Sequence, residues 1–147
     1  MMEKRFERFA AAVLEMNRYL QRIKEQEMRR FGLRSAHTMC IFYLGQHPEG
    51  LTVTQLTEIC REDKAAVSRN LSELSRMGLV SCSAPPDRRV YRDPYRLTER
   101  GTEIAAQVEA RVSDALSACG RGLTEAQRDN FYTAAQIIIS NLEDYAE

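Results

Sequence analysis

Residues 63–76 could read the edges of DNA bases from one face of a helix. With Val67, Leu71 and Leu74 turned inward at about 100° per residue, the opposite face combines small side chains with long donors. A guanidinium matches O6 and N7 of guanine, a serine hydroxyl donates or accepts, and an alanine can touch the thymine methyl. This face consists of Ala65, Ser68, Arg69, Ser72 and Arg76. Taken alone, such a pattern is more often a solvated helix face.

Two neighbouring segments add groups that suit a DNA backbone. Thr52, Thr54 and Gln55 stand at the start of an expected helix, where free amides and the helix dipole favour a phosphate. An expected hairpin follows residue 78, and a hairpin rich in arginine can enter the minor groove, where negative potential is concentrated. Its arginines are Arg88, Arg89, Arg92 and Arg96. Three such segments in this order favour DNA binding.

Helix-boundary signals place these groups on a compact run of elements. Thr52 and Gln55 form a capping box, and Asp63 suits the N-cap of the next helix. Between them the turn lacks glycine, so Arg61 must accept a positive φ unless the turn runs another way. Ser35 is expected to cap an earlier helix that ends near residue 45. Two short helices joined by a tight turn predict a helix-turn-helix.

The segment after this motif is expected to be a β-hairpin. Residues 79–83 and 90–97 suit two strands, and Pro85-Pro86-Asp87 suits a turn between them. Pro94 has no amide donor, so the returning strand should lie at an edge or be bulged there. The predicted fold class is mostly α with a small β wing.

Helices on both sides of this lobe are expected to carry apolar seams. The first spans residues 1–31, a second runs from about 98 to 119, and a capping box of Thr124 and Gln127 opens the last. The seams consist of Phe6, Phe9, Val13, Met16, Leu20 and Ile23 in the first helix and of Phe131, Ala135, Ile138, Leu142 and Tyr145 in the last. Packing within the chain is one explanation, but a homodimer interface is favoured.

Residues 33–101 resemble the MarR-type (multiple antibiotic resistance) regulators. The matching stretches are Leu51–Leu56, Asp63–Arg69 with Leu74 and Gly78-Leu79-Val80, Asp87-x-Arg89, and Leu97-Thr98-x-x-Gly101. The resemblance implies a single domain over residues 1–147, with a winged helix-turn-helix lobe at 33–101 and dimerisation helices at 1–31 and 102–147. It also adds Lys64, Asp87, Arg88 and Arg89 to the expected DNA contacts.

In such proteins Arg89 would reach the minor groove and Asp87 would help to orient it. The sequence departs from the family pattern in its wing, because Asp87 to Leu97 spans ten positions, which is longer than usual. The positions of Arg92 and Arg96 are therefore left open.

The expected function is that of a homodimeric transcriptional repressor that binds an inverted-repeat operator in double-stranded DNA. The resemblance implies release by a small aromatic or anionic effector, bound between the dimer unit and the DNA-binding lobe. Residues that could line its pocket are Met16, Tyr19, Arg22, His37, Met39 and Tyr43. No cofactor is expected.

Two other sensing chemistries remain open. His37, Cys40 and His47 could supply three zinc ligands, but no fourth is obvious, so no metal site is expected. Cys40, Cys60 or Cys82 could sense oxidants, although reduced thiols without an evident activating base are the expectation.

Other function classes fit less well. The chain has no GxSxG, no HExxH and no glycine-rich phosphate loop, so an enzyme is not expected. A winged-helix adaptor for protein contacts should show an apolar patch where this chain has small polar residues.

The net charge is zero, but it is unevenly distributed. Residues 1–34 carry nine basic and five acidic side chains, whereas residues 101–147 carry three basic and eight acidic ones.

No segment is apolar for long enough to cross a bilayer or act as a secretory signal, so a cytoplasmic location is expected.

Overall fold

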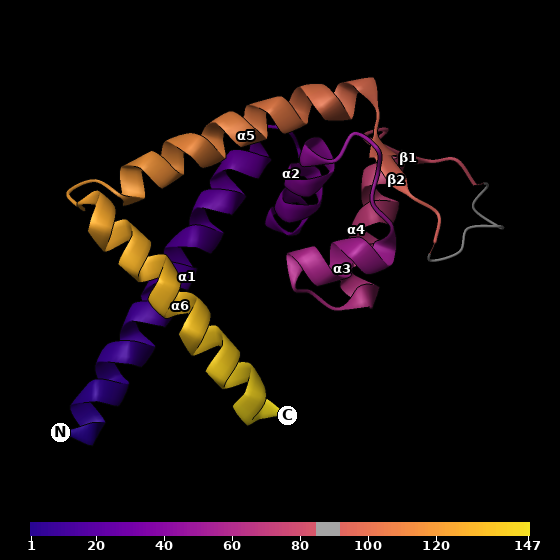
Figure 1. The fold of residues 1–147 in the computed structure, drawn as a ribbon. Coiled ribbons are helices and arrows are strands. Elements are labelled where there is room, and N and C mark those ends of the chain that lie inside the picture. Colours follow the sequence, from indigo (N-terminus) through magenta and orange to yellow (C-terminus); the bar gives the residue numbers. More distant parts are fainter. Residues whose placement is uncertain (85–91) are drawn as a thin grey trace. The chain divides into compact units, whose positions relative to one another are not determined.

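The computed structural model describes residues 1–84 and 92–147. It is mostly helical with one two-stranded antiparallel sheet, which confirms the predicted fold class (Figure 1). The elements in order are α1 (Met2–Arg29), the 3-10 turn η1 (Ser35–His37), α2 (Thr38–Gln46), α3 (Val53–Cys60), α4 (Lys64–Arg76), β1 (Val80–Cys82), β2 (Tyr95–Leu97), α5 (Glu99–Cys119) and α6 (Glu125–Ala146).

The chain divides into two compact units, Met1–Arg111 and Val112–Glu147, and the division lies within α5. The hydrophobic core belongs to the first unit, where apolar side chains from the end of α1 to the middle of α5 pack together. Its fully buried members include Met28, Ile41, Leu44, Leu56, Val67, Leu71, Leu74, Leu79 and Val108. This core holds α3 and α4 in place.

Local capping signals fix most of the helix boundaries. At α3, the Gln55 amide donates to Thr52 Oγ1 over 3.1 Å, and the Thr52 amide donates to Gln55 Oε1 over 2.9 Å. The Ala66 amide donates to Asp63 Oδ1 over 2.7 Å at the start of α4. The same reciprocal box opens α6 at Thr124. All three predicted caps are confirmed, because each needs only residues three apart.

The end of α1 also follows the sequence. Gly32 has φ +69°, and the Leu33 amide donates to the Met28 carbonyl over 3.0 Å. This is a Schellman motif, in which a left-handed glycine lets the chain close the last helical turn. Gly32 therefore ends the helix close to the predicted bound at residue 31.

The expected cap at Ser35 is wrong. Ser35 lies inside a 3-10 turn, and α2 begins only at Thr38, whose hydroxyl donates to the Ser35 carbonyl over 2.8 Å. The N-cap of this turn is Arg34. The reason is tertiary, since residues 34–37 are held by hydrogen bonds to α4, described below.

The sheet is shorter than the sequence predicts within the described residues. Val80 pairs with Leu97 and Cys82 with Tyr95. Leu51 forms an isolated antiparallel bridge beside this sheet, because its amide and carbonyl both bond to Tyr95. Pro94 stands just before β2, so its missing N–H interrupts no ladder bond of β2.

The junction between the sheet and α5 is tightly closed. The Thr98 hydroxyl donates to the Gly78 carbonyl over 2.7 Å and accepts from the Gly101 amide over 3.1 Å. The Thr98 amide donates to the Leu79 carbonyl over 3.0 Å. Gly101 is buried, and a Cβ on it would fall against the Leu79 carbonyl oxygen. The Leu-Thr-x-x-Gly pattern thus joins the end of α4 to the start of α5.

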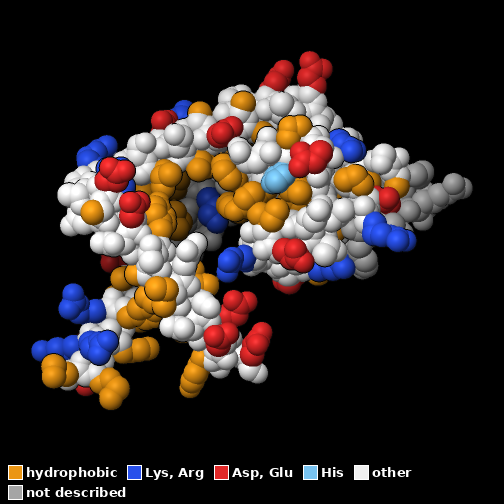
Figure 2. All heavy atoms as spheres, in the orientation of Figure 1, with side chains coloured by type: hydrophobic (Ala, Val, Ile, Leu, Met, Phe, Trp, Pro, Cys, Tyr) orange, Lys and Arg blue, Asp and Glu red, His pale blue; other side chains and the backbone are white. Residues whose placement is uncertain are grey.

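Apolar side chains are exposed on helices near both ends of the chain (Figure 2). On α1 the seam from Phe6 to Ile23 is open to solvent, with Phe6 71% exposed. None of the 22 residues of α6, all within the described part of the chain, is buried. Within the described residues, no helix is both long and apolar enough to cross a membrane.

Candidate nucleic-acid interface

The outer face of α4 is built as the sequence predicts. Val67, Leu71 and Leu74 are each 0% exposed and anchor the helix to the core. The candidate base-reading residues lie on the exposed side, and they are Lys64, Ala65, Ser68, Arg69, Ser72 and Arg76. The helix therefore presents small polar side chains and long cations outward together.

The turn between α3 and α4 runs through a strained residue. Arg61 has φ 54° and ψ 42°, in the left-handed region, and no other non-glycine residue of the described chain has a positive φ. Of the two alternatives that the sequence left open for this turn, the structure therefore shows the positive φ at Arg61. A Cβ in the left-handed region costs about 1–2 kcal/mol.

Replacing Arg61 with glycine is expected to stabilise the protein by about 0.5–1 kcal/mol. The steric cost of the left-handed conformation disappears. The greater freedom of glycine in the unfolded chain offsets roughly 0.5–1 kcal/mol of that gain in stability. Urea unfolding should show a higher midpoint with an unchanged slope. Arg61→Ala is the control, because it removes the guanidinium but keeps the Cβ, and it should show no gain. Equal behaviour of the two variants would contradict the assigned strain.

The start of α3 offers a second, weaker binding feature. Thr54 and Gln55 are exposed, and Thr52 is half-buried. The capping box engages the amides of Thr52 and Gln55 together with Thr52 Oγ1 and Gln55 Oε1, which leaves the Gln55 side-chain NH2 group and the backbone amides of Val53 and Thr54 as donors for a phosphate.

The wing lies partly outside the described residues. Asp87, Arg88 and Arg89 belong to residues 85–91, so their predicted roles stay predictions. Arg92 and Arg96, on the described part of the hairpin, are both exposed.

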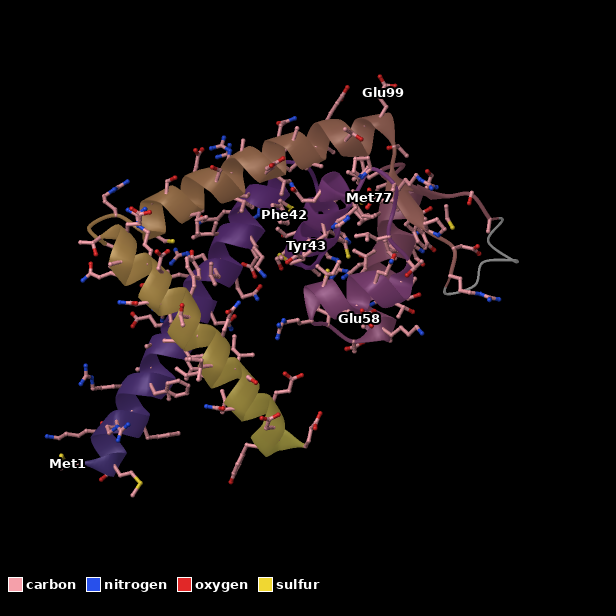
Figure 3. The ribbon with its side chains drawn as sticks, viewed as in Figure 1. Met1, Phe42, Tyr43, Glu58, Met77 and Glu99 are labelled. Atoms are coloured by element: carbon pink, nitrogen blue, oxygen red, sulfur yellow. The ribbon has the colours of Figure 1, made fainter. Side chains whose placement is uncertain are left out.

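The residues suggested for an effector pocket fall into two groups. Met16, Tyr19 and Arg22 are exposed on α1, where the Arg18 guanidinium lies 5.0 Å from the centre of the Tyr19 ring. Met39 and Tyr43 are half-buried on α2, and the Tyr43 ring meets Phe42 edge-on at 5.3 Å (Figure 3).

His37 differs from these residues. It is 3% exposed, and both ring nitrogens are engaged, Nδ1 by the Arg34 amide and Nε2 by Glu73. This geometry argues against direct effector binding by His37. It also leaves no nitrogen for a metal, and residues 1–84 and 92–147 contain no group of three or more His, Cys, Asp or Glu side chains that could hold an ion.

The cysteines show one pairing that the sequence did not reveal. All four are free thiols. Interaction with the Cys60 thiol and burial raise the pKa of Cys40, and interaction with the Cys40 thiol lowers the pKa of Cys60. A second thiol is not a base, so the expectation of reduced thiols without an evident activating base stays a prediction. An oxidant-sensing role stays a prediction.

Two polar residues of α4, Asn70 and Glu73, make contacts that the sequence did not predict. Asn70 is 3% exposed, and its side-chain amide donates to the Ala36 carbonyl over 3.1 Å. Glu73 bonds to Arg34 and His37. A polar residue three positions after the buried Val67 was the available signal, since a buried amide needs a partner.

The comparison with protein families matches residues 31–90 to the MarR family. The search of curated proteins found no match to this chain. Among solved structures, a MarR family transcription regulator superposes with a TM-score of 0.81 at 21% identity, covering 99% of this chain and 95% of that one.

Two structures from Staphylococcus aureus are also similar. A MepR–DNA complex has a TM-score of 0.81 at 16% identity and covers 91% of this chain and 96% of that one. MarR in complex with salicylate and kanamycin has a TM-score of 0.80 at 14% identity and covers 97% and 95%. These likenesses show the fold. The match to the MarR family covers the helix-turn-helix lobe, and the solved structures share the winged-helix fold.

Proposed function

We propose that the protein binds DNA in a sequence-specific manner through the outer face of α4, as a homodimer. The observation that carries this proposal is that the apolar face of α4 is completely buried while Ser68, Arg69 and Ser72 all point outward. Small residues let a helix approach base edges closely, and Arg69 can bond both acceptors of a guanine. The similar MepR structure contains DNA, which is consistent with this use of the fold.

The homodimer is proposed from the exposed seams. An isolated helix needs tertiary packing for most of its stability. The seams of α1 and α6 expose Phe9, Val13, Ile138 and Leu142, each 40% or more accessible. A second copy of the chain presents the same apolar surfaces and so can cover them reciprocally. A dimer would carry two copies of α4, which suits an inverted-repeat operator.

Repression and release by an effector are the finer part of the proposal. The similar Staphylococcus aureus MarR structure holds salicylate, an aromatic anion. On this chain, the half-buried Tyr43 and the exposed Tyr19 supply aromatic rings, the exposed Arg22 supplies a cation, and the half-buried Met39 adds an apolar side chain. They are the first positions to test with such a ligand.

The deciding experiment is selection of duplexes from a random pool, followed by gel shifts at two salt concentrations. A basic surface on DNA should bind less tightly as salt rises, with a log–log slope that counts neutralised phosphates. A recovered inverted repeat with half-sites about one helical turn apart would support the dimer. Failure to bind any duplex at low salt would favour the hypothesis of a winged-helix adaptor for protein contacts.

Arg69→Ala is expected to weaken binding to the selected duplex by roughly 1–3 kcal/mol, with little change on a scrambled duplex. A base contact adds affinity only where the right base is present. Arg89→Ala should instead weaken both duplexes and make the salt slope shallower by about one, because a wing contact is mainly with the backbone. Fluorescence anisotropy on both duplexes separates the two patterns. If Arg69→Ala weakens both equally, α4 does not read bases through Arg69.

A further inference from the structure

We infer that Glu73 is a positioning residue of α4: it ties the recognition helix to residues 34–37 and fixes which side of the helix faces DNA, without touching DNA itself. The inference rests on the proposed function, because it concerns how the same face of α4 is presented. It assigns a role in DNA reading to an acidic side chain, the type that a polyanion repels.

Three side-chain hydrogen bonds connect one side of α4 to residues 34–37. Glu73 Oε2 lies 2.6 Å from Arg34 Nη2 and 2.6 Å from His37 Nε2. One turn earlier, the Asn70 side chain donates to the Ala36 carbonyl over 3.1 Å. Asn70 and His37 are each 3% exposed, so their bonds are shielded from competing water. We call these three contacts the η1–α4 clamp.

The hydrogen-bond directions in the clamp are determined by the backbone. The Arg34 amide donates to His37 Nδ1 over 3.1 Å, so Nδ1 must be the unprotonated acceptor. The single ring proton then sits on Nε2 and is directed at Glu73. Hydrogen bonds from Arg34 and His37 hold the pKa of Glu73 below its ordinary value, so it is a carboxylate at neutral pH. In this arrangement Arg34 and the Nε2–H group of His37 are the donors, and the Glu73 carboxylate is their common acceptor.

The clamp fixes the rotation of α4 about its own axis, which the apolar core alone does not do. The buried contacts of Val67, Leu71 and Leu74 are non-directional, and they would tolerate a small rotation of α4 about its axis. At 100° per residue, Glu73 lies about 40° around the helix from Arg69. A rotation that moved Glu73 away from Arg34 would thus move Arg69 by the same angle. Short, charge-assisted bonds resist that rotation because they depend on direction.

The test measures affinity for two probes, the duplex selected by the parent protein and a scrambled duplex of equal composition. Glu73→Gln keeps the side-chain volume but removes the charge that Arg34 and His37 share. If the clamp positions α4, binding to the selected duplex should weaken about tenfold while binding to the scrambled duplex is unchanged or tighter. Loss of a negative charge beside DNA would by itself tighten both.

Glu62→Gln is the matched control. Glu62 is an exposed acid in the same helix-turn-helix, and among the described residues no hydrogen bond or ion pair engages its side chain. This control should bind both duplexes as tightly as the parent or more tightly. Glu73→Gln behaving like Glu62→Gln, or showing no change, would overturn the inference.

A double-mutant cycle adds an internal check on the partner. Arg34→Ala should weaken selected-duplex binding in the parent background, and the added loss should be smaller when Glu73→Ala is already present. Equal losses in both backgrounds would mean that Arg34 acts independently of Glu73 and would overturn the clamp. Thermal unfolding of each variant confirms that the assay measures folded protein. If the parent selects no duplex, it is the proposed DNA-binding function that fails.

Discussion

Gly101→Ala is expected to destabilise the protein by about 3 kcal/mol, which corresponds to a drop in Tm of roughly 10 °C. The added Cβ would fall against the Leu79 carbonyl oxygen, 3.0 Å from the Leu79 carbonyl carbon and 3.2 Å from Leu97 Cδ2. Backbone cannot retract as a flexible side chain can, so α5 must separate from the end of α4. The Thr98 bonds to Gly78 and Leu79 would be strained together with it.

Calorimetry or a circular dichroism melt measures this effect. Gly120→Ala is the matched control, because its added Cβ would meet nothing closer than 3.5 Å and its φ is not positive. It should change stability by less than about 1 kcal/mol. A Gly101→Ala protein that melts with the parent would mean that α5 does not approach Leu79 as closely as described.

Ile138→Asp with Leu142→Asp is expected to convert the proposed dimer to a monomer at micromolar concentration. These side chains are 40% and 53% exposed on α6 of the single chain and form part of its apolar seam. In a dimer they would be covered, and two unpaired carboxylates there would cost several kcal/mol. Sedimentation velocity reports the change in mass directly.

The control introduces the same charges at the same spacing on the other side of the helix. Gln136 and Ser140 are exposed, and at 100° per residue both lie away from the seam. Gln136→Asp with Ser140→Asp should leave the dimer intact. A parent protein that sediments as a well-folded monomer would contradict the dimer itself, whereas dissociation of both double variants would contradict only the assignment of the seam.

Elements that depend on neighbouring residues alone could be predicted from the sequence. The caps at Thr52, Asp63 and Thr124 join residues three apart, so they form wherever the chain starts a helix. The period of Val67, Leu71 and Leu74 predicted both the buried and the open face of α4. The missing glycine left two alternatives for the turn before α4, and the left-handed Arg61 is the one that the structure shows.

The contacts that hold those elements together depend on how the helices pack and could not be predicted from the sequence. Ser35 has the residue type of a cap, yet bonds from residues 34–37 to α4 draw this stretch into a 3-10 turn. Glu73 and His37 are 36 positions apart, and Cys40 and Cys60 stand on different helices. A periodic pattern tells which side of a helix is buried but not which distant group it meets. Those partners depend on how the helices pack, so the η1–α4 clamp emerges only once the core has brought η1 and α4 together.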